Sequence, residues 1–108
     1  MDTKLAIAAF EALSNETRLA VFRLLVKAGP DGLSAGEIAE RLGVVQNTMS
    51  SHLQKLSRAG IVISRRQSRH IIYRADFQTV RALILYLLED CCRGEAELRE
   101  PLAASLAC

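Results

Sequence analysis

Three cysteines have the most distinctive chemistry in this 108-residue chain, and all lie in its last eighteen residues: Cys91, Cys92 and Cys108. Structural zinc takes four tetrahedral ligands, which one copy of this chain cannot supply from cysteine alone. Adjacent thiolates instead suit a soft, thiophilic centre of low coordination, such as trivalent arsenic or antimony. Three thiols would accept inorganic arsenite or antimonite, whereas two would suit an organoarsenical. The cysteines therefore predict a trivalent metalloid site, with or without Cys108.

Other roles of these thiols compete with that prediction. Cys91 falls on the apolar stripe of a predicted helix, where a free cysteine is often a small buried side chain. A disulfide from Cys91 or Cys92 to Cys108 would instead make a redox switch, and sulfide sensing is a related alternative. A thiol enzyme needs an activating base or a helix N-terminus beside its nucleophile. The adjacent pair lies at a predicted helix C-terminus among carboxylates, so we predict that the chain is not an enzyme.

A second feature is a long segment without acidic residues. Residues 41–75 contain seven basic side chains and neither Asp nor Glu, although the net charge of the whole chain is only +2. A block of one charge sign typically marks a surface that meets a polyanion such as nucleic acid. A solvated basic face and a module that binds only proteins are the competing interpretations. The seven residues are Arg41, Lys55, Arg58, Arg65, Arg66, Arg69 and Arg74.

The elements that position these residues follow from hydrophobic spacing and capping signals. Half of the residues are hydrophobic and 24% are charged, which excludes a disordered chain. The apolar segment 5–13 predicts a first helix, and a second follows over 16–27. The apolar stripe of that second helix consists of Leu19, Phe22, Leu25 and Val26. Ser34 and Glu37 have the spacing of a capping box that begins a third helix, and Gly43 is placed to end it.

The fourth predicted helix, over 46–58, has an unusual polar face. Met49, Leu53 and Leu56 form its apolar stripe. Most of the remaining residues are amides and hydroxyls, which form poorer helix than the Glu and Lys of ordinary surface helices. Such side chains can hydrogen-bond to base edges in the major groove of DNA, which accommodates an α-helix. The polar face consists of Gln46, Asn47, Thr48, Ser50, Ser51, Gln54 and Lys55.

A hairpin and a last helix complete the predicted domain. β-branched residues predict a two-stranded hairpin over 61–74, with its turn at residues 67 and 68 and a basic tip. A cap at Asp76 begins a last helix over 76–92. Its main apolar stripe consists of Phe77, Val80, Ile84, Leu87, Leu88 and Cys91. Residues 94–108 then form a C-terminal tail that ends with a cysteine.

This order of elements is that of a winged helix-turn-helix, and three segments within it resemble the ArsR/SmtB family of bacterial transcriptional repressors. The segments are the second helix with its start, ALSNETRLAVFRLL, the helix pair AGEIAERLGVVQNTMSSHLQKLSRAGIV and the hairpin SRRQSRHIIYRAD. The fold class expected is mainly α with a small β-hairpin, with about five helices and a two-stranded wing. A single domain would span 1–108, with its helix-turn-helix at 34–58. The resemblance further implies a DNA-binding repressor that an inducer releases from its operator.

The predicted DNA contacts form two groups. On the fourth helix, base edges would be contacted by Gln46, Asn47, Thr48, Ser50 and Ser51. His52 and Gln54 would lie near phosphates, with Lys55 beside them. His52 is expected to be structural or phosphate-contacting rather than a metal ligand. Arginines at the hairpin tip would follow the DNA backbone or enter the minor groove. These arginines are Arg65, Arg66 and Arg69.

The terminal helices predict a homodimer. One chain offers one recognition helix, so specific binding to an imperfect palindrome needs two copies. The helices over 1–13 and 76–92 are apolar on more sides than one chain of this size can bury. In the second of them, the residues outside the main stripe are Leu83, Leu85 and Tyr86. We therefore expect these two helices to form the dimer interface, as the family resemblance also implies.

Members of this family typically bind an inducer that releases DNA, and the positions of the inducer's ligands differ among subgroups. The third helix lacks the Cys-x-Cys pair that members of the family often have, because all three cysteines lie near the C-terminus. The last helix lacks the histidine-containing ligand set of zinc-sensing members, since the only histidines are His52 and His70. Their absence argues against zinc, cadmium or lead. The adjacent cysteines at the end of the last helix instead resemble those of arsenic-responsive members. The sequence has no signal peptide and no apolar run long enough to cross a bilayer, so we expect a soluble cytoplasmic protein without a membrane partner.

Overall fold

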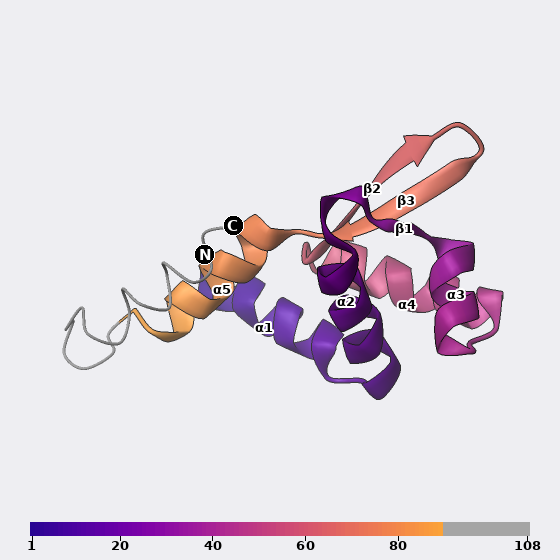
Figure 1. The fold of residues 1–108 in the computed structure, drawn as a ribbon. Helices are drawn as coiled ribbons and strands as arrows, with labels where there is room; N and C mark the ends of the chain where they lie inside the picture. The colour runs from indigo at the N-terminus through magenta and orange to yellow at the C-terminus, as the bar shows by residue number, and fades with distance from the viewer. Residues whose placement is uncertain (90–108) are drawn as a thin grey trace.

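The computed structural model describes residues 1–89, in which a winged helix-turn-helix follows an N-terminal helix (Figure 1). In chain order the elements are α1 (Thr3–Leu13), α2 (Glu16–Ala28), the short 3-10 helix η1 (Gly29–Asp31), β1 (Leu33–Ser34), α3 (Ala35–Leu42), α4 (Gln46–Arg58), β2 (Val62–Gln67), β3 (His70–Ala75) and α5 (Phe77–Leu87). Helices α2, α3 and α4 carry the β2–β3 hairpin, which confirms the predicted fold class. All three cysteines, and the predicted tail over 94–108, lie outside the described residues.

Side-chain caps determine where most of the helices begin. Asn15 caps α2, and Asp76 caps α5 as predicted. Ser34 and Glu37 form the predicted capping box of α3, with 3.2 Å between the Glu37 nitrogen and the Ser34 Oγ. Gly43 then ends α3 in the left-handed conformation (φ 64°), which a residue without Cβ adopts at little cost. These local signals place the two helices of the helix-turn-helix where the sequence predicts them.

The wing contains the predicted hairpin and a third short strand at its base. β3 lies between β2 and β1, and both pairings are antiparallel. Leu33 pairs with Tyr73, which ties the chain entering α3 to the wing. Gly32 (φ 69°) permits this approach, because a Cβ at that position would collide with the carbonyl oxygen of Tyr73. The turn comes one residue later than predicted, since Gln67 still belongs to β2 and Ser68 takes a φ of 56°.

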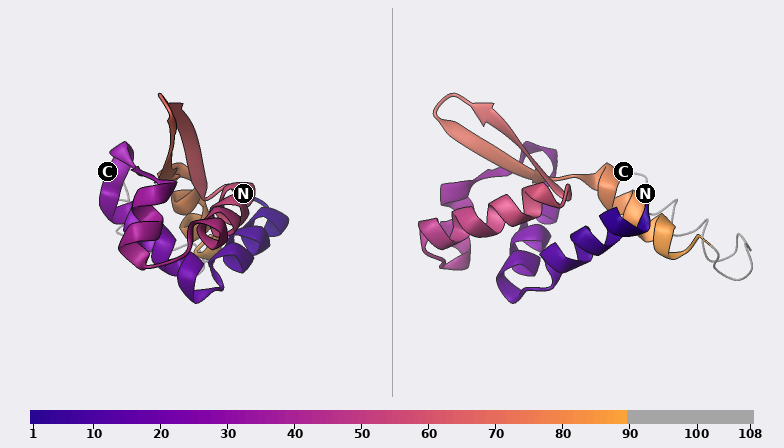
Figure 2. Two further views of the ribbon diagram at one scale, coloured as in Figure 1. Left: turned by 90° about the vertical axis from the view of Figure 1, so that its right-hand side faces the viewer. Right: turned by 180° about the vertical axis from the view of Figure 1, so that it is seen from behind.

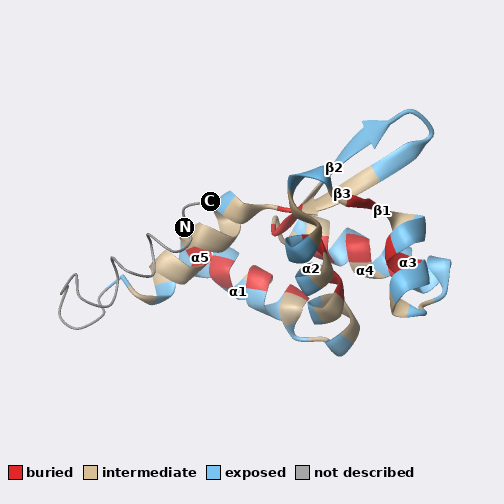
Figure 3. Ribbon diagram, in the orientation of Figure 1, coloured by how far each residue is buried: buried red, intermediate tan, exposed pale blue. Residues whose placement is uncertain are grey.

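The core is built from α1, α2, α3, α4 and the base of the wing, together with Leu83 of α5, and Figure 3 shows the buried positions. The prediction for α4 is confirmed, because all three residues of its apolar stripe are fully buried. The prediction for α2 is partly wrong: Leu25 is buried, but Leu19 and Val26 are exposed and Val21 is buried instead. The reason is that α2 contacts α3, α4 and β3 through the side that carries Val21 and Leu25.

Helices α1 and α5 lie side by side at the end of the molecule away from α3 (Figures 1 and 2). A hydrogen bond between the hydroxyls of Thr3 and Tyr86 joins them. Helix α1 fully buries only alanines and half-buries Leu13 against the core, while three of its large apolar side chains are exposed to solvent. The exposed residues are Leu5, Ile7 and Phe10. The first helix is therefore present as predicted, but most of its apolar surface is uncovered within one chain.

Helix α5 is shorter than predicted, and its buried residue lies outside the predicted main stripe. It ends at Leu87, and the N–H of Leu88 bonds to the carbonyl of Ile84 at 3.2 Å. The predicted continuation over 90–92 lies outside the described residues. Leu83, which the prediction placed outside the main stripe, is the buried residue of α5, whereas Leu87 is exposed. Periodicity thus identified an amphipathic helix but not the side of it that faces its own chain.

Candidate nucleic-acid interface

Helix α4 presents the polar face that the sequence predicts. Its apolar residues are fully buried and fix the rotation of the helix. The opposite side chains are therefore directed outward, where amides and hydroxyls can form hydrogen bonds to another molecule. The exposed residues are Gln46, Asn47, Thr48, Ser50, Ser51, Gln54 and Lys55.

A polar groove of about 620 Å³ runs between α4 and the wing. The sequence predicted four of its residues, but it missed Ser57, Ser64 and Tyr73. Ser64 and Tyr73 are opposite each other in the β2–β3 pairing, so both side chains lie on the face of the hairpin that looks toward α4. The groove residues are Asn47, Ser50, Ser51, Gln54, Ser57, Ser64 and Tyr73.

The predicted wing arginines are all exposed, but they are not equivalent. Successive side chains of a strand point to opposite faces, so Arg66 shares the face of Ser64 that lines the groove, and Arg65 lies on the other face. Arg65 Nη2 donates a hydrogen bond to the carbonyl oxygen of Asp31 in η1 at 3.3 Å. The structure therefore directs Arg66 toward the α4 side of the wing and holds Arg65 against the body of the domain.

His52 is half-buried on the side of α4 away from the polar groove, where it contacts Arg18 of α2. The Nη1 of Arg18 lies 3.4 Å from Nδ1 of His52, and its Nε donates a hydrogen bond to the Ala12 carbonyl at 2.6 Å. Burial lowers the pKa of His52, and the positive charges of Arg18 and Lys55 lower it further. A neutral imidazole with the proton on Nε2 lets Nδ1 accept from Arg18. This contact supports a structural role for His52, which is one of the two roles that the sequence predicts for it.

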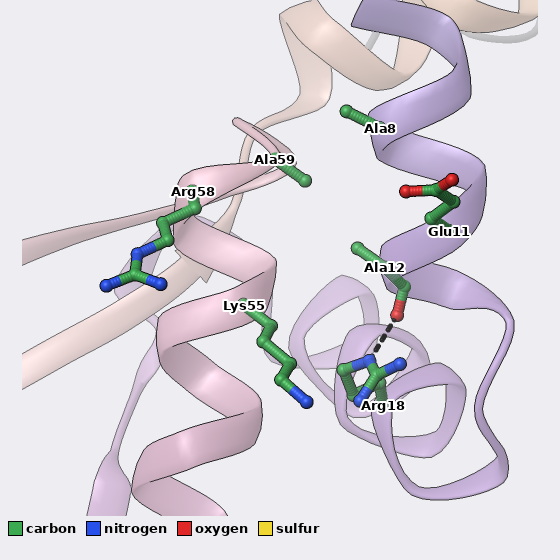
Figure 4. Close-up of a pocket in the computed structure, with 7 residues that line it drawn as sticks. All are labelled: Ala8, Glu11, Ala12, Arg18, Lys55, Arg58 and Ala59. Carbon is green, nitrogen blue, oxygen red and sulfur yellow. Dashed lines mark hydrogen bonds between the residues drawn. The ribbon is translucent and has the colours of Figure 1, made fainter.

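Arg18 and Lys55 share a hollow of about 340 Å³ between α1, α2 and α4 (Figure 4). Figure 4 shows the two side chains extending toward each other from α2 and α4, with Glu11 entering from α1. Small side chains, Ala8 and Ala12 among them, leave the space open. Arg18 thus links the end of α1 to the side of the predicted recognition helix.

The described residues contain no group of three or more His, Cys, Asp or Glu side chains that could hold a metal ion. The predicted ligands Cys91, Cys92 and Cys108 lie outside them. Within the same part of the chain, no helix is long and apolar enough to span a membrane.

Residues 13–65 match a family model described as a helix-turn-helix domain, and with the wing this defines a winged helix-turn-helix transcriptional regulator. The HTH-type transcriptional regulator YceK of Bacillus subtilis (strain 168) is 40% identical over 81 residues, which cover 72% of this chain and 80% of that protein. The transcriptional activator HlyU of Vibrio cholerae is 32% identical, covering 82% of this chain and 80% of that one. The chain belongs to the ArsR/SmtB family of DNA-binding transcriptional regulators, which agrees with the prediction that it is not an enzyme.

Solved structures and a more distant relative agree with this assignment. An ArsR-like transcriptional regulator from Rhodococcus sp. RHA1 superposes with a TM-score of 0.69 at 32% identity, covering 94% of this chain and 90% of that one. A homodimeric winged helix-turn-helix DNA-binding domain from Mycobacterium bovis gives 0.66 at 26% identity, covering 80% and 78%. The arsenical resistance operon repressor of Escherichia coli (strain K12) is 28% identical over 107 residues, covering 99% and 89%.

Proposed function

We propose that the protein is a homodimeric repressor that binds an imperfect palindrome through α4 and the wing. The observation that carries this proposal is the exposed polar face of α4, which borders a groove whose other wall is a hairpin with exposed arginines. An α-helix of this kind fits the major groove, and basic side chains beside it can neutralise phosphates. In this proposal the polar residues of α4 recognise bases, and the wing arginines position the protein on the duplex.

The dimer is supported by the apolar surface of α1 and α5. Leu5, Ile7 and Phe10 of α1 and Leu87 of α5 are all exposed in one chain. The two helices lie at the end of the molecule away from α3 (Figure 1). An interface that uses the same surface of both copies would cover these side chains and place two recognition helices on one duplex. The relative from Mycobacterium bovis is homodimeric.

The proposed inducer is trivalent arsenic or antimony, bound by Cys91 and Cys92 with Cys108 as the third thiol. The support is the soft-ligand chemistry of the thiols and the similarity, at 28% identity, to an arsenical resistance operon repressor. The adjacent cysteines follow α5 in the sequence, so a bound metalloid can favour one packing of this dimer helix over another. A coupling of about 1–3 kcal/mol would weaken operator affinity about 5- to 150-fold.

A titration of sodium arsenite into the protein bound to its operator tests the proposal. The operator is first isolated by selection from a pool of randomised duplexes, and the affinity is followed by fluorescence anisotropy at several salt concentrations. Arsenite is expected to release the wild-type protein, and the Cys91→Ser, Cys92→Ser double variant is expected to remain bound. Normal release of that double variant would exclude the proposed site. The mass of the arsenic adduct of Cys108→Ser reports whether a third thiol is consumed.

A thiol-redox or sulfide sensor of the same fold is the second candidate. It is favoured by the similarity to HlyU of Vibrio cholerae, of which a structure of the reduced protein, 31% identical to this chain, is known. Hydrogen peroxide, rather than arsenite, would then release DNA from the wild-type protein and not from Cys108→Ser. Release by peroxide without any response to arsenite would decide for this candidate.

A further inference from the structure

The start of helix α4 differs from the starts of the other α-helices in the described residues. Helices α1, α2, α3 and α5 each begin at a side chain that caps their backbone N–H groups, whereas α4 begins at Val45, which cannot do so. The four capping residues are Asp2, Asn15, Ser34 and Asp76. Valine is among the poorest residues for this position, and serine, threonine, asparagine or aspartate there would stabilise the helix. Within the described residues, α4 is the one α-helix without a capping side chain.

Val45 is also unusually exposed for an apolar residue. Its side chain is 71% exposed, the largest value among the exposed large hydrophobic residues of the described chain. Its neighbour Val44 is half-buried and packs against the core. The backbone of Val45 is extended (φ −61°, ψ 138°), and its carbonyl accepts the first hydrogen bond of α4, from Met49 at 2.9 Å. The apolar side chain is thus held in solvent at a defined position, directly before Gln46 and Asn47.

The location of Val45 indicates what it contacts. In helix-turn-helix proteins, the N-terminal residues of the recognition helix contact the base edges. Most groups there are hydrogen-bond donors or acceptors, but thymine also presents the apolar C5-methyl group in the major groove. A valine provides two methyl groups of its own and no competing polar atom. Its neighbours Gln46 and Asn47 supply the hydrogen bonds that would fix the adjacent bases.

We infer that Val45 is a specificity-determining residue that recognises the methyl group of a thymine in each half-site of the operator. The inference rests on the proposed function, because it requires α4 to lie in the major groove. The protein would accept a less stable helix start in exchange for an apolar contact with DNA. Removal of one buried methyl contact is expected to weaken binding about fourfold.

Substitution of thymine by deoxyuridine tests the inference, because it removes the C5-methyl group and leaves base pairing intact. Each thymine of the selected operator is replaced in turn, symmetrically in both half-sites. For the wild-type protein, deoxyuridine at one of the thymine positions is expected to weaken binding about fourfold per half-site. For Val45→Ser, the thymine and deoxyuridine duplexes are expected to bind equally at that position. The control Leu19→Ser, which removes an exposed apolar side chain from α2, should keep the wild-type sensitivity.

A melting experiment on Val45→Ser separates recognition from folding. Serine is expected to cap α4, so the Tm should rise while the sensitivity to the thymine methyl group disappears. An unchanged deoxyuridine effect in Val45→Ser, or no sensitive thymine in the wild-type operator, would overturn the inference while DNA binding itself stands. Failure to select any duplex, even at low salt, would overturn the proposed function as well.

Discussion

The helix-turn-helix and the terminal helices use the same hydrophobic pattern for different contacts. On α4 the apolar stripe is fully buried by the same chain. On α1 and α5, Leu5 and Leu87 are 55% and 57% exposed, while alanines and Leu83 face inward. A 3.6-residue period therefore marks a contact within the chain in one region and a surface available to a second chain in the other. The difference predicts that substitutions will affect folding in one region and assembly in the other.

The largest effect is expected from the buried side of α4. Leu53→Ala removes a fully buried side chain and should lower the free energy of unfolding by about 2–5 kcal/mol. Urea denaturation at a fixed protein concentration measures the change. Gln54→Ala is the matched control. Gln54 is the neighbour of Leu53 in the sequence, but its side chain is exposed, so this substitution should change the free energy of unfolding by less than about 0.5 kcal/mol. Similar losses in the two variants would mean that α4 is not anchored as described.

The second effect concerns assembly. Phe10→Asp places a charge on the exposed apolar side of α1, and burial of that charge in an interface is unfavourable. We expect a monomer in sedimentation experiments and at least about a tenfold loss of operator affinity, because the two half-sites no longer bind together. Leu19→Asp is the control, since Leu19 is 45% exposed on α2 and Phe10 is 42% exposed. A Phe10→Asp protein that stays dimeric would show that the interface lies elsewhere.

The same comparison explains how much of the structure the sequence could predict. Capping signals at Ser34 and Asp76, and a stripe that one chain buries, located the helices and the helix-turn-helix correctly. Strand β1 was missed because two residues are too few to show an alternating pattern. The side of α5 that faces its own chain could not be predicted, since an apolar stripe does not show whether it contacts the core or a second chain.

The candidate nucleic-acid interface was also predicted only in part. The exposed polar residues of α4 were predicted because helical spacing fixes which side chains point outward once the stripe is known. Ser64 and Tyr73 were missed, because their place in the groove depends on the register of the hairpin and on its position relative to α4. Val45 was missed for another reason: exposure of an apolar side chain is a property of the folded chain. The roles of Cys91, Cys92 and Cys108 stay predictions, since they lie outside the described residues.

A smaller effect distinguishes the arginines of the wing. Arg66→Gln should reduce the slope of log affinity against log salt by about 0.9 per protomer if this side chain neutralises one phosphate. Arg65→Gln should change the slope less, because Arg65 is bonded to the Asp31 carbonyl. Arg23→Gln, an exposed position on α2, is the control. Equal slopes for Arg65→Gln and Arg66→Gln would show that the two faces of the wing are equivalent on DNA.

The smallest effect is a pH dependence that involves both regions, because Arg18 connects the end of α1 to His52 of α4. Burial and the charges of Arg18 and Lys55 hold the pKa of His52 below its ordinary value of about 6.5. As the pH falls below that value, His52 binds a proton more readily in the unfolded chain than in the folded one. The contribution of neutral His52 to the free energy of unfolding is therefore complete above about pH 6.5 and is lost as the pH falls toward the pKa of His52 in the folded chain. Thermal melts between about pH 7.5 and 5.5 should show this loss in the wild type and a smaller one in His52→Asn, whose amide oxygen can still accept from Arg18. His70→Asn, on the exposed wing, should melt like the wild type at every pH. If His52→Asn also retained the full dependence, the link between α1 and α4 would not depend on a neutral imidazole.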